Sequence, residues 1–219
     1  MTAVIILIIA CILAYLFGSV SFAVIISERF IKKDVRELGS GNAGMTNVMR
    51  SAGVGPGILT FVCDCLKGVA AGLMGRFLVF PLLFKFTGNT FFSDINGALF
   101  LGVFCLIGHV FPLFFNFRGG KGVATVGGVA IAACPLSFAA ALGVFLLVAL
   151  VTRTVSAGSL AAAIVLPFFA FLFEKSHYRI ASLIIMGIMC ITVIIKHKDN
   201  IVRLVKGEER KINFKKKKQ

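Results

Sequence analysis

Long, uninterrupted apolar runs constrain this chain more than any other feature. They cover roughly residues 3–26, 57–84, 97–115, 123–134, 136–151, 160–173 and 180–195. A helix needs about 20 apolar residues to cross a bilayer, whereas the strands of a membrane barrel alternate over ~10 residues. With 58% hydrophobic and 15% charged residues, the chain is predicted to be an all-α integral membrane protein. We expect a polytopic bundle of about seven transmembrane helices; because the fourth run is short, five spans is the alternative.

The placement of positive charge predicts how this bundle is oriented. Cytoplasmic loops of membrane proteins carry an excess of Lys and Arg. With the N-terminus outside and the C-terminus cytoplasmic, the inside segments hold eighteen Lys and Arg and the outside segments three. All the glycine-rich segments between the runs then face the cytoplasm.

The chain ends in a basic segment, so we expect one transmembrane domain over residues 1–200 and a basic cytoplasmic tail over 201–219. The net charge is +14. For a membrane protein, anionic lipid headgroups are a nearer partner than nucleic acid. We therefore expect contact with membrane lipids, no nucleic acid and no obligate protein partner. The six cysteines lie in apolar surroundings without a CxxC pair, which predicts neither disulfides nor a metal site.

The first glycine-rich segment reads Gly39-Ser40-Gly41-Asn42-Ala43-Gly44 and continues to Thr46, Asn47 and Arg50. It matches G-x-G-x-x-G, but a dinucleotide-binding fold needs a strand before this motif, and here an apolar span and a charged segment precede it. An anion-binding loop fits better, because glycines let backbone N–H groups approach an anion and Arg supplies the counter-charge. The alternative is a helix-breaking turn between spans.

The second glycine-rich segment reads Arg118-Gly119-Gly120-Lys121-Gly122. It is not a Walker A loop, since Gly122 stands where a Ser or Thr would hold magnesium. Lys121 and the free amides at the start of the following helix can still bind phosphate. A basic cytoplasmic turn is the alternative.

Some ionisable residues fall inside apolar runs, and Asp64, Lys67 and His109 are candidates for a role there. Asp64 and Lys67 lie three residues apart on one helix face, where charges usually face a protein interior or a wet cavity. They are either a self-neutralising structural pair or part of a site. His109, near the inner end of the third run, is expected to be a hydrogen-bonded structural residue.

Two further polar clusters are predicted at the same membrane surface. Ser156 and Ser159 offer hydroxyl groups that can bind a ligand, although helix capping accounts for at least one of them. His197 and Asn200, three residues apart after the last run, can share a helical face. A basic anchor explains the neighbouring lysines but not these two residues.

Together these segments resemble the bacterial acyl-phosphate:glycerol-3-phosphate acyltransferases, the PlsY family. The resemblance is carried by Gly18-Ser19-Val20-Ser21-Phe22, by residues 39–50, by Asp64-x-x-Lys67-Gly68 and by Gly108-His109-x-Phe111-Pro112. It continues through Gly119-Gly120-Lys121-Gly122-Val123-Ala124-Thr125 and His197-x-x-Asn200-Ile201-x-Arg203-Leu204. These ordered matches span nearly the whole chain. Departures from the family pattern are Ser21 for proline, Ala23 for glycine and Met45 for alanine; the first two are expected to alter the first helix end.

The resemblance implies transfer of a fatty acyl group from acyl phosphate to the sn-1 hydroxyl of glycerol-3-phosphate, giving lysophosphatidic acid and phosphate. It also implies a seven-span protein of the bacterial cell membrane, with its site at the cytoplasmic face and no cofactor or metal. On this hypothesis Arg50 and Lys121 clamp phosphate together with Ser40, Asn42 and Thr46. The remaining groups, Ser156 or Ser159, His197 and Asn200, position glycerol-3-phosphate.

Two other functions stay open at the level of sequence. A transporter of a phosphorylated metabolite would also have broken helices and intramembrane charge. Transporters often show repeated halves, however, and no internal repeat is visible. A lipid-binding scaffold without catalytic activity is the third possibility.

Overall fold

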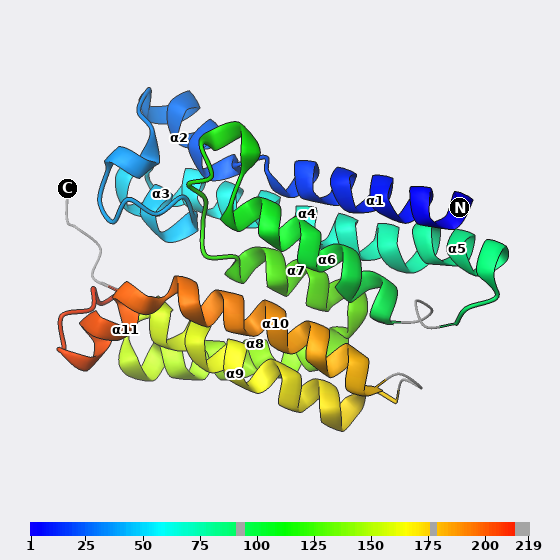
Figure 1. Cartoon of the computed structure of the whole chain (residues 1–219). Coiled ribbons are helices and arrows are strands. Elements are labelled where there is room, and N and C mark those ends of the chain that lie inside the picture. The colour runs from blue at the N-terminus through cyan, green and yellow to red at the C-terminus, as the bar shows by residue number, and fades with distance from the viewer. Residues whose placement is uncertain (91–94, 176–178, 213–219) are drawn as a thin grey trace.

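The helices of this protein lie lengthwise beside one another in two layers (Figure 1). The computed structural model describes residues 1–90, 95–175 and 179–212. One layer contains α1 (Thr2–Gly18), α4 (Val54–Met74), α5 (Phe80–Thr87), α6 (Ile95–Val110) and α7 (Val123–Ala133). The other contains α8 (Pro135–Thr152), α9 (Val155–Phe173) and α10 (Arg179–Lys196).

Short elements gather at one end of the bundle, opposite the N-terminus (Figure 1). They are α2 (Phe22–Ile31), α3 (Met45–Ala52) and α11 (Lys198–Val205). Short 3₁₀ turns at Val35–Glu37 and Leu113–Phe115 complete the connections. The segments predicted to lie at the cytoplasmic face therefore come together at a single end of the molecule.

The all-α membrane fold predicted from the sequence is confirmed. Among the described residues, six helical segments are long and apolar enough to cross a membrane: Thr2–Ile31, Val54–Thr87, Ile95–Phe115, Pro135–Thr152, Val155–Phe173 and Arg179–Lys196. The remaining predicted span, 123–134, forms α7, which has only 11 residues. α7 and α8 meet at Cys134 and pack together, and α7 is seven residues shorter than α8. Along the bundle, the first residue of α7 therefore lies about 10 Å short of the last residue of α8.

The first predicted span, 3–26, corresponds to the helical segment Thr2–Ile31, which is interrupted near its middle. α1 ends at Gly18 and α2 begins at Phe22, so Ser19, Val20 and Ser21 interrupt the run. The second predicted span, 57–84, is longer than expected. α4 passes through a π-helical turn (Gly75–Val79) into α5, which makes a segment of 34 residues. Arg76 in that turn donates to the carbonyl oxygen of Ala132 at 3.0 Å and so caps the C-terminal end of α7.

Glycines bring the helices of the first layer into close contact. A Cβ at Gly68 of α4 would collide with the Thr125 carbonyl oxygen of α7, and one at Gly128 of α7 would collide with the Cys65 carbonyl oxygen of α4. Small residues are the usual means of packing helices in membranes, where lipid tails are as apolar as leucine. This contact places the start of α7 directly beside α4.

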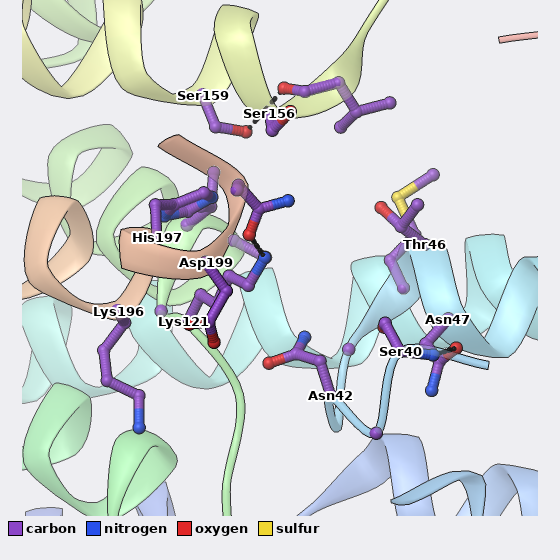
Figure 2. Close-up of a pocket in the computed structure, with 18 of the residues that line it drawn as sticks. Ser40, Asn42, Thr46, Asn47, Lys121, Ser156, Ser159, Lys196, His197 and Asp199 are labelled. Atoms are coloured by element: carbon purple, nitrogen blue, oxygen red, sulfur yellow. Dashed lines mark hydrogen bonds between the residues drawn. The ribbon is translucent and has the colours of Figure 1, made fainter. Parts of the chain in front are cut away.

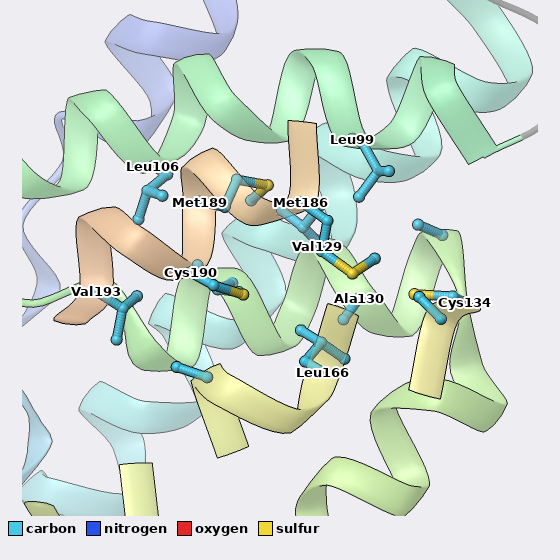
Figure 3. Packing of buried hydrophobic residues seen from close by; sticks show 14 of the residues in the cluster. Leu99, Leu106, Val129, Ala130, Cys134, Leu166, Met186, Met189, Cys190 and Val193 are labelled. Atoms are coloured by element: carbon cyan, nitrogen blue, oxygen red, sulfur yellow. The ribbon is translucent and has the colours of Figure 1, made fainter. Parts of the chain in front are cut away.

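The largest buried apolar cluster joins the two layers (Figure 3). Leu99 and Leu106 of α6 and Val129 of α7 pack there with Met186 and Met189 of α10. Each of these side chains is at most 1% exposed. The cluster fixes α10, and with it α11, relative to the loop that precedes α7.

Candidate active site

A cavity of about 800 Å³ opens at the end of the bundle where the short elements gather. Its wall is formed by the loop before α3, the loop before α7, the start of α9, the end of α10, α11 and the segment after α11. Fourteen residues predicted from the sequence line it: Ser40, Gly41, Asn42, Thr46, Asn47, Arg50, Asp64, Gly119, Lys121, Gly122, Ser156, Ser159, His197 and Asn200. Two predicted residues, Gly120 and Lys67, are buried and are not among the lining residues.

In the described part of the chain, the N-termini of four helices border this cavity. Thr46 lies in the first turn of α3, Val123 begins α7, Ser156 lies in the first turn of α9, and His197 immediately precedes α11. Unpaired N–H groups and the helix dipole make each N-terminus favourable for an anion. The sequence predicted this property only for α7, because the convergence of the other three depends on the tertiary fold.

The loop before α3 is held in shape by Asn47. The Asn47 side chain donates to the carbonyl oxygens of Val35 and Leu38 at 2.8 and 2.9 Å, and it accepts from the Ser40 N–H at 3.1 Å. With only 2% of its surface exposed, Asn47 uses its amide to shape the loop. Gly41 takes φ +70°, in the left-handed region that glycine adopts without strain. Ser40 and Asn42 are thereby presented at the cavity wall.

The loop before α7 places Lys121 among polar groups from the far end of the chain. Its ammonium donates to the Asn200 side-chain oxygen. Burial lowers the pKa of Lys121 to about 8, while the carboxylate of Glu209 opposes this shift. Gly122 has φ +86° and begins α7 with a turn that would strain any other residue. Lys121 is therefore a partly desolvated cation beside a helix N-terminus, which favours binding of phosphate.

His197 presents a neutral imidazole to the cavity. Its Nδ1 lies 2.8 Å from the carbonyl oxygen of Val193, and a carbonyl can only accept, so Nδ1 carries the proton. Burial lowers the pKa of His197 to about 4. The Nε2 atom of this tautomer has a free lone pair and can accept a hydrogen bond from a hydroxyl group.

The segment after α11 returns to the cavity. The Glu209 carboxylate accepts from Asn200 at 2.9 Å and from Arg203 at 2.8 Å, and the Ile212 N–H donates to the Arg153 carbonyl oxygen. Burial alone would raise the pKa of Glu209, but the hydrogen bonds from Arg203 and Asn200 lower it. α11 crosses the predicted boundary at residue 200, and residues 201–212 help to build the cavity. The Lys215–Lys218 run lies outside the described residues.

Figure 2 shows how these groups face one another. His197 lies on the same side as Ser156 and Ser159, Lys121 reaches into the middle of the view, and Ser40, Asn42 and Thr46 lie on the other side. The Ser159 hydroxyl donates to the Val155 carbonyl oxygen within α9 at 3.0 Å. Both predicted serines thus reach the site, on the same side as His197.

Several cavity residues were not selected as site residues from the sequence. They are the cations Arg118, Lys196, Lys198, Arg203 and Arg210, the carboxylates Asp199 and Glu209, and His109. One signal was available for Arg203, which follows Asn200 by three residues and therefore shares its helical face. Nothing local distinguishes Glu209 from the adjacent Glu208, because only the return of the chain separates them.

These features define a class of protein. A multi-pass helical membrane protein with a cation-rich cavity and helix N-termini at one end of its bundle is suited to bind phosphate-bearing ligands at the membrane surface. Within this class, the chain belongs to the glycerol-3-phosphate acyltransferase family, whose model matches residues 8–207.

Relatives and solved structures agree with this membership. The chain is 38% identical to "Glycerol-3-phosphate acyltransferase 2" of Bacillus anthracis, over 94% of this chain and 98% of the relative. It is 41% identical to a glycerol-3-phosphate acyltransferase of Listeria welshimeri, over 95% and 98% of the two chains. The crystal structure of PlsY (YgiH) in its glycerol 3-phosphate form matches with a TM-score of 0.80 and 33% identity, over 97% of this chain and 96% of that one. The lysophosphatidic acid form of PlsY matches with a TM-score of 0.77.

Proposed function

We propose that this chain transfers a fatty acyl group from acyl phosphate to the sn-1 hydroxyl of glycerol-3-phosphate, giving lysophosphatidic acid and inorganic phosphate. Family membership supports the acceptor and the product, because PlsY has been solved in a glycerol 3-phosphate form and a lysophosphatidic acid form. One observation carries the proposal. Lys121, His197 and Asn200 meet at one cavity although 76 residues separate the first from the second in the chain.

Both substrates carry phosphate, and the cavity offers cations from different segments to hold them. Lys121 and Arg50 are proposed to clamp phosphate oxygens, with Ser40, Asn42 and Thr46 as hydrogen-bonding groups. Charge-assisted hydrogen bonds of this kind are roughly twice as strong as neutral ones. The N-termini of α3 and α7 supply additional N–H donors at the same wall.

The reaction needs no protein nucleophile, because acyl phosphate is already activated. The sn-1 hydroxyl oxygen attacks the carbonyl carbon, the bond from that carbon to the phosphate oxygen breaks, and the hydroxyl proton leaves with the phosphate. The His197 Nε2 lone pair is proposed to accept a hydrogen bond from the hydroxyl and so to orient it. Positioning and charge stabilisation of this kind can supply most of the rate enhancement. A trapped covalent acyl-enzyme on a serine or cysteine would contradict this direct transfer.

The acyl chain is proposed to leave the cavity between α4 and α8. Phe61 of α4 and Phe145 of α8 both line the cavity, and both belong to segments that can span the membrane. Phe61 is also 41% exposed. An acyl chain placed there would have its phosphate end at Lys121 and its tail in the bilayer.

The proposed site faces the cytoplasm, with the N-terminus on the opposite side of the membrane. All cavity loops lie at one end of the bundle, away from the N-terminus, and this end also carries most of the Lys and Arg (Figure 1). The positive-inside rule therefore favours this orientation. Residues 1–200 are proposed to form one membrane domain, to which α11 and the segment after it add Arg203 and Arg210 at the cavity. The other basic residues of the tail are proposed to contact anionic lipid headgroups.

The direct test is phosphate release by purified, detergent-solubilised protein given palmitoyl phosphate and glycerol-3-phosphate. Release that depends on glycerol-3-phosphate, with lysophosphatidic acid formed in equal amount, is the expected result. Folded protein that forms no product with several chain lengths, in detergent and in lipid vesicles, would contradict the proposal. Uptake of glycerol-3-phosphate into vesicles without conversion would instead identify a transporter.

A further inference from the structure

We propose that Asp64, Lys67 and His109 form a positioning network that ties the break between α1 and α2 to the loop carrying Lys121. The network would set the geometry of the phosphate site without contacting the reacting atoms. The inference rests on the proposed function, and it assigns a role to charges that the phosphate chemistry itself leaves unused.

The network begins at the interruption of the first span. Where a helix breaks inside a bilayer, its free carbonyl groups need partners, because no water is available there. The Lys67 ammonium donates to the carbonyl oxygens of Gly18 and Val20 at 3.1 and 2.9 Å. The Phe22 ring lies 5.7 Å from the ammonium, and the Lys67 side chain is 0% exposed. Lys67 therefore joins α4 to both sides of the break.

Asp64 links this buried cation to the cavity. Its carboxylate lies 2.8 Å from the Lys67 ammonium and 3.5 Å from Nδ1 of His109, yet its side chain is only 4% exposed. A lysine without a carboxylate partner would be costly at this depth. The contact between Asp64 and Lys67 is sufficient to neutralise the lysine. Asp64 makes a second contact, however, with His109, which lines the cavity.

His109 carries the connection to the phosphate loop. Its carbonyl oxygen accepts from the Gly120 N–H at 3.2 Å. Its imidazole packs so closely against Gly120 that a Cβ there would collide with Nε2, and a Cβ at Gly119 would collide with the His109 carbonyl oxygen. The backbone carbonyl and the imidazole of His109 are thus both in close contact with Gly119 and Gly120, the two residues before Lys121. The Asp64 carboxylate lies beside Nδ1 of this imidazole. In the proposed network it sets the orientation of the ring, and with it how closely the loop can approach α6.

A purely structural pair and a positioning network predict different behaviour when both charges are removed together. Replacing a buried ion pair by uncharged residues of similar volume is often neutral for stability, whereas removing one partner is strongly destabilising. In the double variant, the stability lost through an unpaired charge would then recover. The orientation of His109 would not recover, because an amide at position 64 no longer pairs with the imidazole as a carboxylate does.

The test compares Asp64→Asn, Lys67→Met and the double variant Asp64→Asn/Lys67→Met. Thermal unfolding in detergent reports on folding, and calorimetric titration with inorganic phosphate reports on the site independently of turnover. We expect each single variant to unfold at a lower temperature. The double variant should regain the part of the loss caused by an unpaired buried charge, but not the part caused by the Gly18 and Val20 carbonyls losing the Lys67 donor. We also expect the double variant to bind phosphate about tenfold more weakly than wild type, because small displacements of a binding group have effects of this size or larger.

A second comparison decides the outcome even if the double variant does not fold. His109→Gln keeps the ion pair and should fold, yet should weaken phosphate binding by a similar factor. Combining it with Asp64→Asn should weaken binding no further than the stronger single change, because both act through the same contact. Glu174→Gln, which removes a carboxylate at the opposite end of α9, is the matched control and should leave binding and turnover unchanged.

Three results would overturn the network. They are wild-type phosphate affinity in a folded double variant, wild-type affinity in His109→Gln, and fully additive losses in Asp64→Asn/His109→Gln. If wild-type protein binds phosphate but never transfers an acyl group, the proposed function fails instead. The affinity comparisons still test the network in that case.

Discussion

The charge of Lys121 should limit the reaction at alkaline pH. Burial places the pKa of this lysine at about 8 in the free protein, below its usual value of 10.5. Its ammonium is the form that binds phosphate, so kcat/KM should fall as pH rises through this value. About nine-tenths of the lysine is charged at pH 7 and about one-tenth at pH 9, which predicts about a tenfold fall in kcat/KM between them.

No other titrating group hides this alkaline fall in kcat/KM, which is called the alkaline limb of the pH profile. The second pKa of a phosphate ester is about 6, so glycerol-3-phosphate stays dianionic above pH 7. Burial places the pKa of His197 at about 4, so this imidazole stays neutral throughout the same range. Bound phosphate raises the pKa of a neighbouring cation. The alkaline fall in kcat, which reports the pKa of Lys121 with substrate bound, should consequently occur at higher pH than the fall in kcat/KM, which reports the free protein.

The assay is phosphate release from palmitoyl phosphate between pH 7 and pH 10, corrected for hydrolysis without protein. Lys121→Arg is the matched control, because a guanidinium stays charged over this range. That variant will be less active, since a planar fork replaces a compact ammonium, but its remaining activity should show no alkaline limb. A flat kcat/KM profile in the wild type, or an unchanged limb in Lys121→Arg, would refute the reasoning.

Three further predictions concern binding and packing. Lys121→Ala should abolish turnover while the protein still inserts into membranes, and near-wild-type turnover would remove the lysine from the phosphate site. Asn47→Ala removes three hydrogen bonds, to the Val35 and Leu38 carbonyls and from the Ser40 N–H, of which the one to Val35 is buried; at about 1–3 kcal/mol for a lost buried hydrogen bond, thermal unfolding should occur at a lower temperature. Phe61→Trp should raise KM for palmitoyl phosphate more than for a short-chain donor and leave KM for glycerol-3-phosphate unchanged. An equal effect on both donors would place the acyl chain elsewhere.

Much of the architecture follows from local properties of the sequence. Apolar runs determine spans because a bilayer has no partner for free backbone groups, so a long apolar segment is driven into a helix. The glycine-rich segments were predicted to bind anions for an equally local reason, since glycines and a nearby cation can form an anion site within one loop. Lys121 and Arg50 illustrate this, since both line the cavity.

Only the tertiary structure decided which of these local features work together. Lys121 and Asn200 are 79 residues apart, and Lys67 and the Gly18 carbonyl are 49 residues apart. No periodicity connects such positions, because their contact depends on how closely α4, α6 and α7 pack. Ser21 and Ala23 predicted a change at the end of the first helix, but not the break after Gly18, because a lysine from another helix stabilises its free carbonyls. Asn47 shows the same limit: its residue type was consistent with ligand binding, but the folded loop uses its amide to hold the backbone.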